Sequence, residues 1–272
     1  MPSIIPDGPL REAFGASARV AVLTGAGISA ESGIPTFRDA LTGLWSNFDA
    51  ESLATPEAFR RDPAFVWGWY EWRRAQVARA QPNAGHLALA RLESMARDVV
   101  VVTQNVDDLH ERAGSHAVVH LHGSLFAPRC VDCSQPHRFG DDLPAEPDGG
   151  RRLTPPACAA CGGMVRPGVV WFGEALPTAA WSRAIDAVEA CDLLLVVGTS
   201  GLVQPAARLP AVAREAGATV VAVNLQPSAI DAVAHYVLRG EAGALLPMLL
   251  GADDGAAVRP RAKRLGEGWG SG

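Results

Sequence analysis

The stretch VLTGAGISAESGIPTFRD (residues 22–39) decides the fold, because it joins an apolar run to a glycine-rich turn. The run RVAVLT (19–24) is typical of a buried parallel strand, and Gly25, Gly27 and Ala30 after it fit the pattern G-x-G-x-x-A. Glycines in such a turn let backbone N–H groups approach a pyrophosphate. Alone, the pattern fits a plain tight turn about as well as a nucleotide site.

The residues after this turn depart from a dehydrogenase pattern. An ordinary dinucleotide fingerprint continues into a helix and a second strand that ends in an acidic residue. Here Gly33 and Pro35 end the helix early, and TFRDALTGLW (36–45) reads as a loop. Long loops inside compact α/β domains are usually functional. The sequence therefore disfavours hydride transfer and indicates that other chemistry is arranged at this loop.

Alternating strand and helix patterns predict an α/β fold, a Rossmann-like doubly wound parallel sheet. The further predicted strands are DVVVVT (98–103), AVVHLH (117–122), CDLLLVVG (191–198) and ATVVAVN (218–224). The predicted helices cover residues 83–97, 178–190, 205–216 and 241–250. We expect one catalytic domain over residues 1–250, with a small zinc-binding module inserted at about 126–166, and a disordered tail over 251–272.

Composition narrows the class of protein. The chain has 272 residues, is 48% hydrophobic and carries a net charge of −5, so it can bury a large core and has no basic stripe for nucleic acid. The N-terminus lacks a signal-peptide pattern, and the most apolar run, DLLLVVG, is too short to cross a bilayer. We therefore expect a cytoplasmic protein with neither nucleic-acid nor membrane partners.

Four of the five cysteines form two C-x-x-C pairs separated by 24 residues. In a reducing compartment this pattern favours metal over disulfides, and closed four-thiolate sites are structural zinc sites. The predicted zinc ligands are Cys130, Cys133, Cys158 and Cys161. The remaining Cys191 begins an apolar run and is expected to be buried and inert.

Two polar groups of residues follow predicted strands. Gln104, Asn105 and Asp107 come after the run 98–103, where they would either hydrogen-bond a sugar or an amide, or cap a helix. His120 and His122 lie two apart, so on a strand they face the same side. A strand histidine is often a satisfied core residue, but His122 stands at a strand end before a glycine, which fits an exposed base.

The tryptophan-rich stretch FVWGWYEWRRAQVARAQ (65–81) contains Tyr70 and Arg73, which lie on the same side of a helix. A surface arginine on a helix packed through its tryptophans would also explain this spacing. Arg74, the next residue, is expected to be solvated.

Taken together, these pieces resemble the sirtuin family of NAD-dependent protein-lysine deacylases. The two cysteine pairs and six stretches carry the resemblance, in the family's order. These stretches are GAGISAESGIPTFRDALTGLW (25–45), TQNVDDLHERAG (103–114), HLHGSL (120–125), RPGVVWFGE (166–174), GTSGLVQPAA (198–207) and VNLQPS (223–228).

The resemblance implies NAD and Zn²⁺ as cofactors, with His122 as general base and Asn105 as a second catalytic residue. The implied NAD-binding residues are Gly25, Ala26, Gly27, Ser29, Glu31, Gly33, Phe37, Arg38, Trp45, Gln104, Asn105, Asp107, Gly198, Thr199, Ser200, Asn224, Leu225, Gln226 and Ala242. The segment VVWFGE would pair with the substrate backbone as an added strand. Its implied substrate-binding residues are Val170, Trp171, Phe172, Gly173 and Glu174.

The reaction that the resemblance implies begins with attack of the acyl-lysine carbonyl oxygen on the nicotinamide ribose, which expels nicotinamide. His122 then takes a ribose hydroxyl proton, and the products are free lysine, nicotinamide and O-acyl-ADP-ribose. The partners would be acylated lysine side chains of proteins. The long loop after the glycine turn fits this chemistry, because splitting the glycosidic bond requires a cofactor shielded from water.

Tyr70 and Arg73 also match the Tyr-x-x-Arg signature of the class III sirtuins, which remove negatively charged acyl groups, and Ala40 matches a small residue beside that pocket. An arginine fork can take the terminal carboxylate of a succinyl or malonyl group. We therefore expect a desuccinylase and demalonylase with weaker deacetylase activity. The alternatives are a plain deacetylase, a mono-ADP-ribosyltransferase and a non-catalytic NAD- or zinc-dependent interaction protein.

Overall fold

The computed structural model describes residues 8–36, 50–95, 98–139 and 150–250. Its strands are β1 (Arg19–Thr24), β2 (Asp98–Thr103), β3 (Val118–His120), β4 (Arg129–Cys130), β5 (Val165–Arg166), β6 (Leu193–Val197), β7 (Thr219–Asn224) and β8 (Tyr236–Arg239). Six of them form one parallel sheet in the order β3-β2-β1-β6-β7-β8, and β4 pairs with β5 in a separate antiparallel hairpin. The predicted doubly wound α/β fold is confirmed.

Helices alternate with these strands along the chain. The α-helices are α1 (Gly8–Ala16), α2 (Gly27–Ala30), α3 (Ala50–Leu53), α4 (Pro56–Arg61), α5 (Pro63–Arg79), α6 (Ala84–Ser94), α7 (Leu109–Ala113), α8 (Thr178–Ala190), α9 (Leu209–Glu215) and α10 (Ala242–Leu249). Two 3₁₀ turns, η2 (Ala206–Arg208) and η3 (Ala229–Ala232), complete the set in the described residues.

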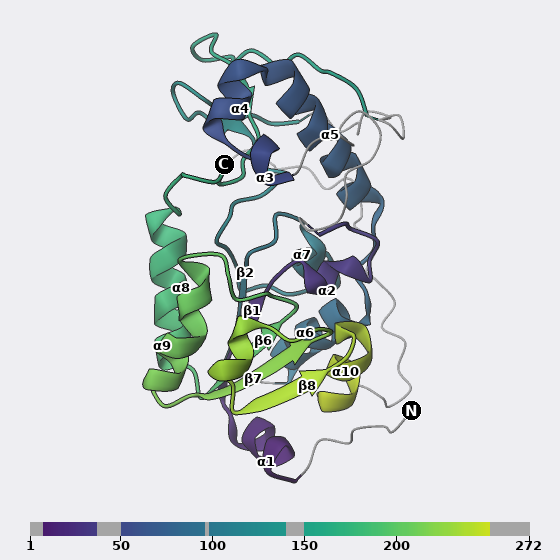
Figure 1. Cartoon of the computed structure of the whole chain (residues 1–272), viewed down its shortest axis with the longest axis vertical. Helices are drawn as coiled ribbons and strands as arrows, with labels where there is room; N and C mark the ends of the chain where they lie inside the picture. The colour runs from purple at the N-terminus through teal and green to yellow at the C-terminus, as the bar shows by residue number, and fades with distance from the viewer. Residues whose placement is uncertain (1–7, 37–49, 96–97, 140–149, 251–272) are drawn as a thin grey trace, which may run out of the picture.

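Helices cover both faces of the sheet, as Figure 1 shows, with α8 and α9 on one side and α6 and α10 on the other. Successive side chains of a strand point to opposite faces. In β1, Val20 and Val22 accordingly join the core beneath α1, α6 and α10, whereas Ala21 and Leu23 join the core beneath α8 and α9. Burial on both faces explains why these strands read as continuous apolar runs.

The strand register brings four chain segments to one edge of the sheet. Thr24 pairs with Thr103 of β2 and with Val197 of β6, and Val197 pairs with Val223 of β7. The residues that follow β1, β2, β6 and β7 therefore emerge together at the carboxyl edge. From β1 the sheet continues through β2 and β3 in one direction, and from β6 through β7 and β8 in the other. Open α/β sheets bind ligands at such a switch point between two central strands.

Capping residues explain where several helices begin. The Asn83 side chain accepts the backbone N–H groups of Gly85 at 2.9 Å and His86 at 3.4 Å, and His86 Nδ1 accepts the N–H of Asn83 in return. Asp62 accepts the N–H of Phe65 at 3.1 Å at the start of α5. These bonds satisfy amide groups that have no partner inside the helix.

A third core lies apart from the sheet, above it in Figure 1, around α3, α4 and α5. Its members from α5 include Trp67, Trp69 and Tyr70, packed with Val169 and Trp171 from the segment after β5. Helix α5 therefore shares its core with the region of the β4–β5 hairpin. It takes no part in the two cores that cover the sheet.

The segment that follows residues 140–149 is fastened to α5 and its N-terminus. The N–H of Leu153 donates to the carbonyl of Ala64 at 2.9 Å, and Arg152 contacts Asp62 at 2.5 Å. Gly68 allows this approach, since a Cβ at this position would lie 2.0 Å from the backbone oxygen of Arg151.

Most predicted elements are confirmed, with differences at their ends. β1, β2 and α8 have the predicted bounds, whereas the strand predicted over residues 117–122 ends at His120. The helix predicted over 205–216 is divided into η2 and α9. The edge strand β8 was not predicted, because its YVLR sequence is only partly buried and lacks a continuous apolar run.

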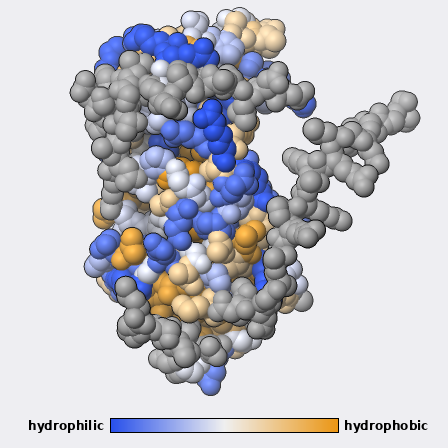
Figure 2. All heavy atoms as spheres, turned by 90° about the vertical axis from the view of Figure 1, so that its right-hand side faces the viewer, coloured by the Kyte–Doolittle hydropathy of each residue, from blue (hydrophilic) through white to orange (hydrophobic). Residues whose placement is uncertain are grey.

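One face of the molecule shows apolar patches among hydrophilic side chains of the described residues (Figure 2). No helix in the described part of the chain is long and apolar enough to cross a membrane.

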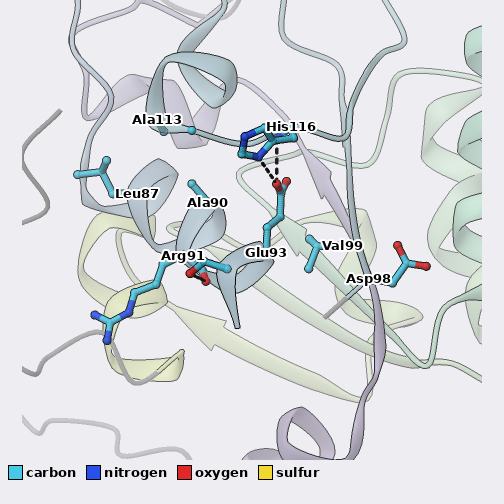
Figure 3. Close-up of a pocket in the computed structure, with 10 residues that line it drawn as sticks. Leu87, Ala90, Arg91, Glu93, Asp98, Val99, Ala113 and His116 are labelled. Atoms are coloured by element: carbon cyan, nitrogen blue, oxygen red, sulfur yellow. Dashed lines mark hydrogen bonds and ion pairs between the residues drawn. The ribbon is translucent and has the colours of Figure 1, made fainter. Parts of the chain in front are cut away.

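A cavity of about 480 Å³ opens at the amino end of β2, between α6 and the end of α7 (Figure 3). His116 donates its backbone N–H to Glu93 there at 2.9 Å. This cavity lies at the opposite end of β2 from the segments that follow the carboxyl ends of the strands.

Candidate functional site

The glycine turn after β1 packs directly on the backbone after β6. Gly27 donates its N–H to the carbonyl of Gly198 at 2.8 Å, and Gly25 donates to Val197 at 3.0 Å. A Cβ at Gly25 would lie 2.8 Å from both the Gly198 oxygen and Thr199 Cβ, and one at Gly27 would lie 2.7 Å from Gly198 Cα. The turn therefore requires glycine at both positions, and this close backbone cradle fits the diphosphate of a dinucleotide.

Three buried polar side chains meet beside this turn. Asn105 Nδ2 donates to Ser29 Oγ at 3.1 Å, and Ser29 Oγ donates to Asp107 Oδ2 at 2.9 Å. Burial raises the pKa of Asp107, while the N–H of Leu109 and the Ser29 hydroxyl oppose that shift. Asp107 Oδ1 accepts the Leu109 N–H at 3.1 Å, so Asp107 both caps α7 and joins this polar group.

Gln104 links three segments at the carboxyl edge. Its side-chain Nε2 donates to Thr199 Oγ1 at 3.0 Å, and its backbone carbonyl lies 3.0 Å from His122 Nδ1. A carbonyl can only accept, so Nδ1 of His122 carries the hydrogen and Nε2 is left as the nitrogen that can take a proton. Burial lowers the pKa of His122, which keeps the imidazole neutral at neutral pH.

His120 is in a different state. One ring nitrogen lies 2.7 Å from Glu111 Oε1 and the other 3.1 Å from the Asn105 carbonyl. Burial opposes protonation of His120, but the carboxylate of Glu111 raises its pKa. Both ring nitrogens of His120 are therefore engaged within the protein, which distinguishes it from His122.

The far end of the candidate site lies after β7. Asn224 Nδ2 donates to the Thr199 carbonyl and to Ser228 Oγ, each at 3.1 Å. Ser200 accepts the Ala229 N–H through its carbonyl at 3.2 Å, and Leu225 is largely exposed. Thr199, Ser200, Asn224 and Leu225 thus lie together next to the glycine turn, and their predicted role in binding NAD stays a prediction.

Glu31 has an internal partner. Its carboxylate accepts the N–H of Gly243 at 2.9 and 3.2 Å, at the start of α10, where Ala242 is buried. The bond ties the end of α2 to α10. Gly33 follows with a φ of +80°, a left-handed conformation that favours glycine.

Four of the predicted site residues lie outside the described residues. They are Phe37, Arg38, Ala40 and Trp45.

Tyr70 and Arg73 lie on α5, away from the sheet. Tyr70 is 3% exposed, and its hydroxyl accepts the indole N–H of Trp171 at 3.0 Å. The guanidinium of Arg73 lies 5.2 Å from the ring centre of Trp69. Burial lowers the pKa of Arg73, whereas Tyr70 and Asp107 raise it, so Arg73 is within electrostatic reach of the polar group beside the glycine turn.

The segment after β5 connects α3 with the end of β3. Val170 donates its N–H to the His122 carbonyl at 2.8 Å, and Phe172 donates to the Ala54 carbonyl at 2.9 Å. Phe172 is half-exposed, and Gly173 has a φ of +86°. Glu174 is engaged inside the protein, because Arg166 holds both of its oxygens at 2.6 and 2.8 Å.

The prediction that Arg74 is solvated is wrong. Arg74 is 4% exposed, and its guanidinium bonds the Glu71 carboxylate at 2.6 and 3.2 Å. The same guanidinium lies 3.7 Å from the ring centre of Phe139. The Glu71 carboxylate three residues earlier on the helix and the ring of Phe139 from a distant segment together allow the Arg74 charge to be buried.

Two residues that position the site were not predicted. Asn83 Nδ2 donates to the Ile28 carbonyl at 2.7 Å and to Ser32 Oγ at 3.0 Å, so the cap of α6 also holds the glycine turn. The helix-start pattern could have indicated the cap, but not these long-range bonds. Arg166 lies 3.5 Å above the ring of Trp171, and no local pattern indicated this contact.

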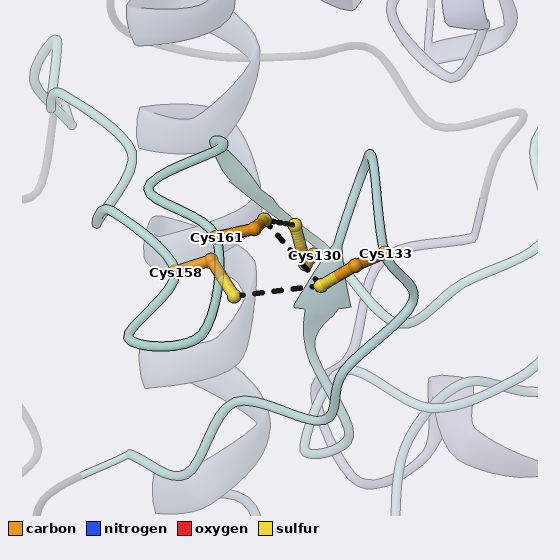
Figure 4. A group of neighbouring side chains, drawn as sticks. All are labelled: Cys130, Cys133, Cys158 and Cys161. Carbon is orange, nitrogen blue, oxygen red and sulfur yellow. Dashed lines mark hydrogen bonds between the residues drawn. The ribbon is translucent and has the colours of Figure 1, made fainter.

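The four predicted zinc ligands come together beside the β4–β5 hairpin (Figure 4). The sulfurs of Cys130 and Cys161 are 3.4 Å apart, those of Cys133 and Cys161 3.4 Å, and those of Cys133 and Cys158 3.7 Å. Tetrahedral zinc with bonds of about 2.3 Å requires sulfurs about 3.8 Å apart. The arrangement fits a structural zinc site.

The electrostatics of this cluster also fit a cation. Backbone N–H groups, that of Cys133 first, lower the pKa of Cys130 to about 7 and favour its thiolate. The N–H of Gly163 lowers the pKa of Cys161, but contacts with the sulfurs of Cys130 and Cys133 raise it to about 12. Sulfurs this close repel one another as thiolates until a divalent cation lies between them.

Comparisons with known proteins agree with this geometry. A model described as "Sir2 family" matches residues 25–205, more than half of the chain. A protein of Methylococcus capsulatus named NAD-dependent protein deacylase is 60% identical over 231 residues, which are 85% of this chain and 91% of that protein.

Two solved structures extend the comparison. The complex described as a Sir2 homolog with NAD has a TM-score of 0.84 and 44% identity, covering 91% of this chain and 93% of that one. The complex described as Sir2-p53 peptide-NAD+ has a TM-score of 0.77 and 29% identity, covering 90% and 97%. The chain belongs to the Sir2 family.

Proposed function

We propose that this chain is an NAD-dependent protein-lysine deacylase that prefers succinyl- and malonyl-lysine to acetyl-lysine. Membership of the Sir2 family and the deacylase name of a relative 60% identical support the general activity. The observation that carries the acyl preference is the placement of Tyr70 and Arg73 on α5, where Tyr70 bonds the same segment whose Val170 bonds His122.

NAD fits the carboxyl edge of the sheet. The cradle formed by Gly25, Gly27 and Gly198 would hold the diphosphate, and Asn105 and Asp107 would hold the nicotinamide ribose. Bound NAD supplies the glycosidic bond that is broken and the ribose that receives the acyl group. The Ser29 hydroxyl fixes the positions of both Asn105 and Asp107, so these side chains are oriented before a ligand arrives.

His122 has the state that a general base requires. Its Nδ1–H is held by the Gln104 carbonyl, which orients the ring and leaves Nε2 as the proton acceptor. Because burial lowers its pKa, the imidazole is neutral at pH values where the base must act. We assign His122 the role of taking a ribose hydroxyl proton.

Arg73 and Tyr70 supply the chemistry for an acidic acyl group. A succinyl or malonyl group ends in a carboxylate, which a guanidinium binds through charge-assisted hydrogen bonds. Tyr70 accepts the bond from Trp171, so its own hydroxyl hydrogen can be donated to that carboxylate. An acetyl group offers neither interaction.

The test is a panel of acetyl, malonyl, succinyl and glutaryl peptides of one sequence, with NAD and mass-spectrometric detection of O-acyl-ADP-ribose. Arg73→Met should cost desuccinylation about 2–5 kcal/mol in kcat/KM, the range for truncating one partner of a buried charged pair. Deacetylation should change little. Arg79→Met, at the exposed end of the same helix, is the matched control. Equal losses for both acyl groups, or a wild-type enzyme that prefers acetyl peptides, contradict the proposal.

A further inference from the structure

Trp171 is held in one position from several sides. Its backbone N–H donates to Glu174 Oε2 at 2.8 Å, and the guanidinium of Arg166 lies 3.5 Å from its ring centre. The ring of Phe59 lies against it at 5.2 Å between centres. Trp171 itself is 3% exposed. These contacts come from α4, from β5 and from the segment after β5, and they hold the indole in addition to its packing against α5.

This fixed N–H points at one oxygen. Trp171 Nε1 lies 3.0 Å from the Tyr70 hydroxyl oxygen, and an indole N–H can only donate. The hydroxyl of an isolated tyrosine can turn its hydrogen to either side of the ring. A donor on one side turns that hydrogen to the other side, so Tyr70 keeps its proton for a second acceptor.

The charges around Tyr70 support this orientation. Burial raises the pKa of Tyr70, so the group is a neutral phenol that retains its hydrogen. Arg73, three residues along the same helix, is the largest influence that opposes this shift, because its positive charge favours the ionised phenol. A carboxylate can accept from both the Arg73 guanidinium and the Tyr70 hydroxyl, and its negative charge makes these bonds stronger than those of a neutral acceptor.

We propose that Trp171 is a positioning residue for acyl selectivity, because its indole N–H fixes the Tyr70 hydroxyl as a donor to the carboxylate of an acidic acyl group. The inference rests on the proposed acyl preference and deepens it. It assigns part of the selectivity to the segment after β5 rather than to α5 alone.

The experiment is a double-mutant cycle with Trp171→Phe and Tyr70→Phe, measured as the ratio of desuccinylation to deacetylation in kcat/KM. Trp171→Phe keeps an aromatic ring but removes the donor. We expect each single variant to lower the ratio by about 2- to 12-fold, the equivalent of one net hydrogen bond. In the Tyr70→Phe background, Trp171→Phe should cause no further fall, because the hydroxyl that it positions is gone.

Trp67→Phe is the matched control, since it removes an indole from the same core, where its ring lies against Phe139, and it should leave the ratio unchanged. The role of Trp171 alone is overturned by either of two results in an enzyme whose wild type prefers succinyl peptides. One is an unchanged ratio of desuccinylation to deacetylation in Trp171→Phe. The other is an equal fall in that ratio when Trp171→Phe is added to Tyr70→Phe. Should Trp171→Phe fail to fold, an unchanged ratio in Tyr70→Phe overturns the inference and a lowered ratio supports it. A wild-type enzyme that prefers acetyl peptides overturns the acyl preference itself.

Discussion

Two buried histidines should make this protein sensitive to mild acid. His86 and His110 are almost completely buried, with ring centres 5.0 Å apart. Burial lowers the pKa of His86 to about 4. Burial, and next the charge of His86, lower the pKa of His110 to about 3. Neither His86 Nε2 nor His110 Nδ1 has a hydrogen-bond partner among the described residues, so a proton there would gain no acceptor.

The sign and size of the effect follow from these values. An unfolded histidine has a pKa of about 6.5, so below that pH the unfolded chain binds protons that the folded chain does not. Stability is therefore lost as the pH falls from about 6.5 towards 4, at about 1.4 kcal/mol per pH unit for each histidine. Between about pH 7 and pH 5 the two together should lower the free energy of unfolding by about 4 kcal/mol.

His86→Gln separates this effect from other acid-sensitive groups. Glutamine at the third position of a capping box accepts the N-cap N–H as His86 Nδ1 does, yet it does not titrate. The variant should lose about 2 kcal/mol less than the wild type between about pH 7 and pH 5, measured by urea unfolding with tryptophan fluorescence. Acid release of zinc would affect the wild type and His86→Gln equally, so it cancels in the comparison. His116 is exposed, so His116→Gln controls for the loss of an imidazole. Identical pH dependence in His86→Gln and wild type would refute the reasoning.

Three further outcomes are expected. Cys133→Ser should lose stoichiometric zinc by metal analysis and all activity, because zinc binding contributes folding energy, and an active zinc-free protein would exclude a structural role. His122→Ala should reduce deacylation by about 10²–10⁴-fold while NAD binding, measured by calorimetry, persists. Retained wild-type turnover would remove His122 from the mechanism. Gly25→Ala should lower the free energy of unfolding by about 1–3 kcal/mol and weaken NAD binding, because its Cβ would lie 2.8 Å from atoms of Gly198 and Thr199. An NAD-induced thermal shift equal to that of the wild type would contradict this.

The central strands and the zinc ligands could be predicted because their signals are local. Every residue of β1 after Arg19 is buried, so the apolar run and the strand coincide. The two C-x-x-C pairs likewise carry their chemistry in their spacing. The edge strand β8 has no such signal, because an edge position leaves side chains partly exposed and removes the apolar run.

Several partners of charged residues could not be predicted, since they come from segments distant in the chain. Glu31 bonds Gly243, 212 positions away, and Arg74 stacks on Phe139. The contacts of Asn83 could likewise be predicted only in part. The sequence indicates a helix start at Asn83, but its bonds to Ile28 and Ser32 depend on how α6 packs beside the glycine turn.

The separate core of α5 has a consequence for how this enzyme could diversify. Tyr70 and Arg73 stand on a helix that packs with Val169 and Trp171, and that is fastened through Ala64 to Leu153. If Tyr70 and Arg73 select the acyl group as proposed, substitutions along α5 could change the acyl selectivity while the residues at the carboxyl edge of the sheet remained unchanged. Laboratory evolution of new acyl choices should begin with this helix and the segment packed against it.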